Sequence, residues 1–348
     1  MRIPMMSVAC KQVQPLVSFQ GGGFQAELNM EAFFRRKDKV VFVIGPTGTG
    51  KSRLAIDLAT RFPSEIINSD KMQVYKGLEI ATNKVTDEEC RGVPHHLLGI
   101  AEPHSNFSAA DFCLHASSAI KSILDRGKLP IIAGGSNSYI DALLNDHDHD
   151  HDHDQRSQFR RQYECCFLWV DVSLPVLNAF VSERVDRMVA AGLIDEVRRM
   201  FDPAADYSRG IRRAIGVPEL DELFGAEARG ASKKTRDRLL QLAIEKIKVN
   251  TCLLARRQLQ KIHRLHPQWC WNVHRLDATE AFLKRHRHQD ADEAWEKLVA
   301  EPANMIVGEF HYGEEIAAMV PSTTTAGACA GPVLSSPVSI AAVAGATR

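Results

Sequence analysis

Short apolar runs alternate along this chain with longer segments in which apolar residues recur every three or four positions. The longer segments are typical of amphipathic helices; one begins at Ser108, whose spacing to Asp111 predicts a capping box. A further helical stretch covers about 193–263, with a break near 203–210. Strands alternating with helices predict an α/β fold, in which helices flank a parallel sheet, with a mainly helical C-terminal part. The short runs predict buried strands at 40–44, 65–68, 129–133 and 165–170.

The first predicted strand leads directly into Gly-Pro-Thr-Gly-Thr-Gly-Lys-Ser at 45–52, and a helix follows. This matches the phosphate-loop pattern G-x-x-x-x-G-K-[ST] in the strand–turn–helix context that the pattern requires. Glycines let backbone N–H groups turn toward an anion, Lys51 and the helix N-terminus add positive charge, and the Ser52 hydroxyl can bind Mg²⁺. We therefore predict a P-loop NTPase-like fold whose di- or triphosphate site is formed by Gly45, Gly48, Thr49, Gly50, Lys51 and Ser52.

A phosphate loop by itself is compatible with a small-molecule kinase or another NTPase. Such enzymes usually hold Mg²⁺ with a second acid at a strand end. The strand at 129–133 ends in two glycines, and Asp171 is the competing candidate, although it can equally cap the helix that follows. The kinase interpretation is therefore weakened and stays as a remote alternative.

Several later segments carry a more specific pattern. They are Ile67–Leu78 (INSDKMQVYKGL), Pro94–Gly99 (PHHLLG), Gly134–Ile140 (GGSNSYI), Arg184–Met188 (RVDRM), Arg213–Gly216 (RAIG) and Arg257–Leu259 (RQL). In this order they resemble the dimethylallyl diphosphate:adenine transferases. That family includes the tRNA dimethylallyltransferases and the adenylate isopentenyltransferases of cytokinin biosynthesis. The resemblance covers roughly residues 40–265.

The resemblance implies transfer of a dimethylallyl group from dimethylallyl diphosphate to the N6 amine of an adenine. The phosphate loop would hold the donor's diphosphate, assisted by Arg184 and by Mg²⁺ on Ser52. Asp70 would be the general base for the poorly nucleophilic N6, and Thr47 would orient N6 by a hydrogen bond. A helix cap or an ion pair is the structural alternative for Asp70. We expect residues that bind the acceptor nucleotide among Gln73, Tyr75, Lys84, Ser136, Asn137, Arg212, Arg213, Lys246 and Lys248, the last four being equally compatible with solvated helix charges.

Three observations bear on whether the acceptor is tRNA or a free nucleotide. The interval 144–165 is too short for the helical domain of the tRNA-modifying branch, and Cys270 has no nearby cysteine partner for a zinc finger. The 43 basic and 43 acidic side chains balance, which gives no broad positive surface for RNA. We therefore predict ATP or ADP as acceptors, with AMP also possible, and no nucleic-acid partner; tRNA modification stays the alternative.

The remaining segments predict the domain organisation. Residues 1–37 are poor in acidic residues, which favours a transit peptide and a plastid location; a disordered extension of a cytoplasmic protein is the alternative. We expect a catalytic core over 38–265, interrupted at about 145–160 by a low-complexity insert that contains an Asp/His run. A partly helical extension over 266–320 and a disordered tail over 321–348 follow. No apolar stretch could span a membrane, the spacing of the eight cysteines predicts reduced thiols, and we expect a monomer.

Overall fold

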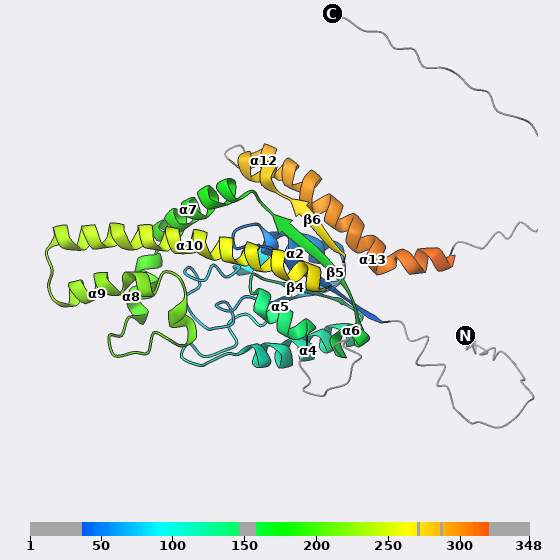
Figure 1. Ribbon diagram of the computed structural model, residues 1–348, viewed down its shortest axis with the longest axis horizontal. Helices are drawn as coiled ribbons and strands as arrows, with labels where there is room; N and C mark the ends of the chain where they lie inside the picture. The colour runs from blue at the N-terminus through cyan, green and yellow to red at the C-terminus, as the bar shows by residue number, and fades with distance from the viewer. Residues whose placement is uncertain (1–36, 146–157, 270–271, 286–287, 320–348) are drawn as a thin grey trace, which may run out of the picture. The chain divides into compact units, whose positions relative to one another are not determined.

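A parallel six-stranded sheet forms the centre of the protein, with strand order β3-β2-β4-β1-β5-β6. The computed structural model describes residues 37–145, 158–269, 272–285 and 288–319, and those from Asp38 onward belong to one compact unit. The predicted α/β fold is thereby confirmed (Figure 1). The strands are β1 (Asp38–Ile44), β2 (Ser64–Asn68), β3 (His95–His96), β4 (Leu129–Ala133), β5 (Tyr163–Asp171) and β6 (Val273–Asp277).

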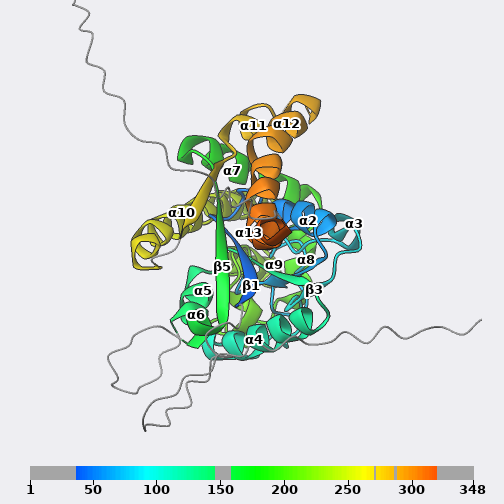
Figure 2. The same cartoon turned by 90° about the vertical axis from the view of Figure 1, so that its right-hand side faces the viewer.

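Helices cover both faces of the sheet because the central strand is apolar on both sides. Val41 and Val43 of β1 pack into one hydrophobic cluster, whereas Phe42 and Ile44 pack into another. The first face is covered by α2 (Lys51–Arg61) and α13 (Glu301–Met319), and the second by α4 (Ala109–Asp125), α5 (Asn137–Leu144) and α6 (Gln158–Gln162), as Figure 2 shows. The capping box predicted at Ser108 and Asp111 begins α4.

The middle of the chain forms a helical part with its own apolar core. It contains α7 (Leu174–Ala190), α8 (Leu193–Met200), α9 (Asp221–Ala228), the short helices Gly210–Arg213 and Pro218–Leu220, and the N-terminal half of α10 (Lys233–Trp269). The 37 residues of α10 span about 55 Å at ~1.5 Å per residue. Its N-terminal half packs in the helical core through Ile247, and its C-terminal half packs on the sheet through Ile262. This one helix therefore links the two parts (Figure 1).

The last described segment returns to the sheet. Strand β6 pairs with β5, and α11 (Thr279–Leu283), α12 (His288–Trp295) and the π-helical turn η3 (Glu296–Ala300) lead into α13. Strands β3 and β6 were not predicted from the sequence, because a two-residue strand and a half-polar edge strand have no continuous apolar run. Strand β6 extends the sheet of the core; the domain boundaries themselves stay a prediction.

Several expectations concern segments that lie outside the described residues: the leader up to residue 36, the Asp/His run at 146–154 and the tail from residue 320. Within the described ranges, the cysteines at 90, 166 and 252 are free thiols. None of the described helices is both long and apolar enough to cross a membrane.

Candidate active site

Loops after three neighbouring strands meet at the carboxyl edge of the sheet, where ligands bind in folds of this kind. The loop after β4 touches the loop after β2 at Gly134, where an added Cβ would lie 2.4 Å from the carbonyl carbon of Ser69. Glycine is therefore required for this close approach. The Lys71 amide then donates to Ser136 Oγ at 2.9 Å, which holds the two loops together beside Asp70.

A cavity of about 1060 Å³ opens at this edge of the sheet. Its wall combines the phosphate loop with α7, α10 and the C-terminal segment 281–295. A diphosphate and a nucleotide can both be accommodated in a volume of this size. Of the residues predicted from the sequence, the wall contains Thr47, Gly48, Gly50, Lys51, Ser52, Asp70, Gln73, Ser136, Arg184 and Arg213.

The three residues predicted to be catalytic lie in this wall together. Arg184 Nη2 donates to Thr47 Oγ1 at 3.1 Å, so α7 reaches the phosphate loop directly. Asp70 Oδ1 accepts from the Met72 amide at 2.9 Å, which orients the carboxylate. Lys51 Nζ donates to the Pro46 carbonyl at 2.7 Å, within its own loop. The carboxylate of Asp70, the hydroxyl of Thr47 and the two cations, Lys51 and Arg184, thus line the same cavity.

The two cations of this group are held in an environment that disfavours their charge. Burial lowers the pKa of Lys51 to about 8; the carboxylate of Asp70 opposes this shift, and Arg184 adds to it. Burial also lowers the pKa of Arg184 to about 10, and the charge of Arg187 contributes. An anion placed between Lys51 and Arg184 would stabilise both charges, so the site is suited to a diphosphate.

The lowered pKa of Lys51 predicts a pH dependence of donor binding. Lys51 is charged below about pH 8 and loses its proton above it. An anionic diphosphate binds the charged form better, so we expect kcat/KM for the allylic donor to fall about tenfold between about pH 7 and about pH 9. Steady-state kinetics across this range would measure it, with KM for the acceptor as the control. A flat profile for the donor would contradict the role of Lys51.

One residue that sequence reading left without a role holds the site together. Gln258 on α10 accepts from the Thr47 amide at 2.7 Å through Oε1 and donates to the Gly135 carbonyl at 2.9 Å through Nε2. It thus bridges the phosphate loop and the loop after β4. Its spacing could have revealed it, because the cavity-lining residues of α10 recur every three or four positions at Ile247, Thr251, Leu254 and Gln258.

The wall also has an apolar section that was not predicted. Phe180 of α7 and Phe282 of α11 pack edge to face with their ring centroids 4.7 Å apart. Met188 and Leu254 line the same cavity from α7 and α10. These side chains would suit a short apolar chain attached to the anion.

Three of the predicted acceptor-binding residues lie elsewhere in the structure. Tyr75 is fully buried, and its hydroxyl accepts from the Phe107 amide at 3.1 Å, so it belongs to the core. Lys84 Nζ donates to the Gly77 carbonyl at 2.6 Å. Asn137 is buried and donates to the Gln258 carbonyl at 3.0 Å. None of the three is part of the cavity wall, so we assign them to the support of the surrounding loops.

The basic candidates divide in the same way, because Arg213 lines the cavity whereas Arg212, Lys246 and Lys248 do not. Arg212 donates to the Met200 carbonyl at 3.3 Å. Lys246 and Lys248 pair with Glu222 and Asp186, at 3.7 Å and 2.8 Å respectively. We therefore do not expect Arg212, Lys246 and Lys248 to bind the acceptor nucleotide. For Lys246 and Lys248, the alternative interpretation as surface charges agrees better with the structure.

Two phosphate-loop residues also stand behind the wall and shape the loop. A Cβ added at Gly45 would lie 2.4 Å from the Val170 carbonyl oxygen, and buried Thr49 donates from Oγ1 to the Pro46 carbonyl at 3.0 Å. Gln73 does line the cavity, but its amide donates to the Thr82 and Asn83 carbonyls, at 3.1 Å and 3.0 Å. It holds one edge of the site in place.

Asp171, the other acidic residue at the end of a predicted strand, forms an ion pair outside the cavity. Asp171 pairs with Arg275 of β6 at 2.6 Å and lies outside the cavity wall. Its side chain therefore does not compete with Asp70 for a role in this cavity. Among the described residues, no group of three or more histidine, cysteine or acidic side chains could hold a metal ion by itself.

Comparisons with known proteins agree with one another. The profile of the IPP transferase family matches residues 73–163 and 149–264. The chain is 61% identical to "Adenylate isopentenyltransferase 5, chloroplastic" of Arabidopsis thaliana, over 88% of this chain and 89% of that protein. It is 54% identical to "Adenylate isopentenyltransferase 7, mitochondrial" of the same plant, over 86% and 88%, and 45% identical to the adenylate isopentenyltransferase of Humulus lupulus, over 77% and 89%.

Two solved structures have a similar fold. One is a eukaryotic dimethylallyltransferase that acts on tRNA, with a TM-score of 0.63 and 24% identity over 78% of this chain and 79% of that one. The other is the tRNA isopentenylpyrophosphate transferase of Bacillus halodurans, with a TM-score of 0.58 and 28% identity over 74% and 98%.

Proposed function

This chain belongs to the IPP transferase family, and from that premise we propose that it acts as an adenylate isopentenyltransferase. It transfers a dimethylallyl group from dimethylallyl diphosphate to N6 of ATP or ADP and releases diphosphate, which is the first step of cytokinin biosynthesis. The observation that carries this proposal is that Asp70, the phosphate loop and Arg184 line the wall of the same cavity.

Asp70 and Thr47 act on the amine. The lone pair of an adenine N6 is delocalised into the ring, so a base must remove a proton as N6 attacks. The Met72 amide holds one carboxylate oxygen of Asp70, and the other takes the proton. Thr47 Oγ1 accepts from Arg184 and has a second lone pair, which can accept from the remaining N6 proton. The attacking nitrogen is thus oriented toward the donor.

Lys51, Arg184 and the phosphate loop act on the leaving group. When the allylic C–O bond breaks, negative charge grows on the diphosphate, and backbone amides with two cations stabilise it. The exposed Ser52 hydroxyl in the same wall fits Mg²⁺, which takes oxygen ligands and is commonly held by one or two protein groups together with substrate phosphates. When bound there, Mg²⁺ would neutralise part of the diphosphate charge.

An acceptor panel tests the proposal. Purified protein is incubated with dimethylallyl diphosphate, Mg²⁺ and, in separate reactions, ATP, ADP, AMP and an unmodified tRNA, and the N6-prenylated product is identified by mass. We expect product with ATP and ADP. Product with tRNA alone would favour the tRNA-modifying alternative, and release of ADP without an allylic donor would favour a kinase.

The small molecules dimethylallyl diphosphate and ATP or ADP are therefore the substrates that we propose, without a nucleic-acid partner and with the protein as a monomer. We further propose import into plastids. Relatives are named chloroplastic or mitochondrial, and the segment 1–37 is poor in acidic residues. Imaging a fusion of about forty N-terminal residues to a fluorescent protein would test this; diffuse cytosolic fluorescence would contradict it.

A further inference from the structure

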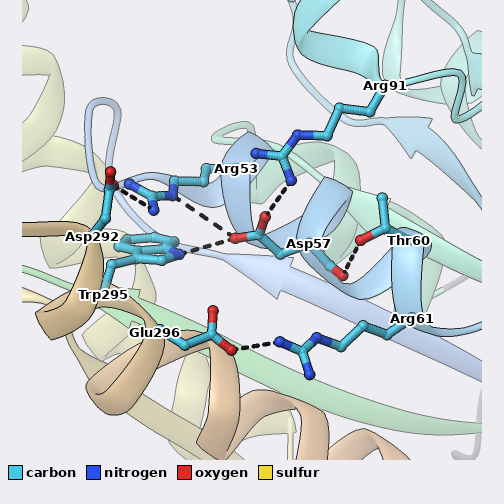
Figure 3. Close-up of polar contacts among 8 residues, drawn as sticks. All are labelled: Arg53, Asp57, Thr60, Arg61, Arg91, Asp292, Trp295 and Glu296. Carbon is cyan, nitrogen blue, oxygen red and sulfur yellow. Dashed lines mark hydrogen bonds and ion pairs between the residues drawn. The ribbon is translucent and has the colours of Figure 1, made fainter. Parts of the chain in front are cut away.

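A polar cluster around Asp57 joins the helix after the phosphate loop to the C-terminal segment. Asp57 lies on α2 with its side chain 14% exposed. It accepts from Trp295 Nε1 of α12 at 3.0 Å and from Arg91 at 3.1 Å, and Arg53 pairs with it at 3.8 Å (Figure 3). A partly buried carboxylate with two hydrogen-bond donors and a neighbouring cation fixes the orientation of the indole ring.

The indole ring is packed against the phosphate loop itself. A Cβ added at Gly50 would lie 2.5 Å from Cη2 of Trp295 and 2.8 Å from Cζ3, so the ring occupies the space that a side chain at Gly50 would take. Gly50 has a φ of +92°, and its carbonyl accepts the first hydrogen bond of α2, from Leu54, at 3.0 Å. Trp295 therefore supports the residue at which the loop becomes the helix N-terminus.

A cation also lies over the ring, at the cavity wall. The guanidinium of Arg53 lies 4.7 Å from the centre of the Trp295 ring and donates to Asp292 of α12 at 2.9 Å. Arg53, Asp292 and Trp295 all line the cavity beside Lys51 and Ser52. The C-terminal segment thus forms part of the wall at the position where the donor's anion would bind.

We propose that Trp295 is a positioning residue of the diphosphate subsite: it holds Gly50 and, through it, the anion-binding end of α2 in the geometry that receives the donor. The proposal rests on the proposed function, because it takes the donor's diphosphate as the ligand of the phosphate loop. Through Trp295, the C-terminal segment contributes to binding of the donor.

The chain offers matched controls that separate this role from ordinary packing. Val299 of η3 is fully buried in the same segment but does not line the cavity. Glu296 pairs with Arg61 across the same interface, outside the cavity, with both side chains about half exposed. Trp295→Phe keeps an aromatic ring at this position but removes the donor to Asp57 and shortens the ring where its distal atoms meet Gly50.

The test measures binding of inorganic diphosphate with Mg²⁺ to the full chain by calorimetry, together with the melting temperature and KM for the allylic donor and for ATP. For Trp295→Leu we expect diphosphate binding at least about tenfold weaker, with KM for ATP changed by less than about twofold. For Trp295→Phe we expect diphosphate affinity to fall about threefold. Val299→Ala should lower the melting temperature and, like Glu296→Gln, leave diphosphate affinity within about twofold.

Diphosphate affinity of Trp295→Leu within about twofold of the unmodified chain would overturn the proposal, and so would an equal loss in Val299→Ala. Failure of the proposed function gives a different result. In that case the unmodified chain binds diphosphate and forms no prenylated adenine, while the loss in Trp295→Leu still supports the positioning role.

Discussion

Replacing Asp70 by asparagine should lower kcat by at least about 10², with much smaller changes in KM for either substrate. The amide oxygen of asparagine can still accept from the Met72 amide, so the geometry of the loop is kept while the proton acceptor is lost. Single-turnover experiments at saturating donor and acceptor would measure the chemical step directly. A parallel loss of kcat and of substrate affinity would indicate a structural role for Asp70.

Asp171→Asn is the matched control for this experiment. Asp171 also stands at a strand end, but it is buried against Arg275 and lies outside the cavity wall. Removing its charge leaves Arg275 without its partner, so we expect a lower melting temperature and a kcat within about threefold of the unmodified enzyme. If Asp171→Asn abolished turnover in a folded protein, the assignment of the base would be wrong.

Replacing Arg184 by glutamine should lower kcat by about 10²–10³, since it removes a cation from the leaving group and the hydrogen bond to Thr47 Oγ1. Arg184→Lys should recover only part of the loss, because an ammonium cannot present the same planar set of donors to the hydroxyl and to an anion. Steady-state kinetics with varied donor would show whether the loss lies in kcat. Lys246→Gln, at a surface pair outside the cavity, is the control and should be nearly neutral.

A double-mutant cycle with Thr47→Ala tests the coupling between the two residues. If Arg184 acts partly by orienting Thr47, the losses in kcat for Arg184→Gln and Thr47→Ala will not add in the double variant. Fully additive losses would show that Arg184 acts on the diphosphate alone.

Local patterns predicted the elements whose signals lie in consecutive residues. The apolar run of β1, the glycine spacing after it and Lys51 follow one another in the chain, so the strand, the loop and the helix could be assigned in order. Asp70 was placed at the cavity because a parallel sheet brings its strand ends to one edge. Of the nine residues predicted for the acceptor, only Gln73, Ser136 and Arg213 line the cavity. Basic and aromatic side chains such as Lys248 and Tyr75 suit surface pairs and cores as well as ligands.

Residues whose roles depend on distant contacts could not be assigned in this way. Gln258 meets Thr47 across 211 positions of sequence, and Trp295 meets Asp57 across 238. The spacing of α10 places Gln258 on the face that lines the cavity, but the sequence does not show that its partner is Thr47, or that Trp295 meets Asp57, because a long-range contact depends on how α10 and α12 pack.

The amino-acid sequence by itself determined the parallel sheet, the glycine-rich loop after β1 and the acid at the same edge of the sheet, since these follow from apolar periodicity, from backbone freedom at glycine and from the order of strands. Only the tertiary structure decided which side chains share the cavity, that α10 bridges the two loops through Gln258, and that the C-terminal segment forms part of the wall. The physical reason is that burial and hydrogen-bond partners are properties of the packed chain.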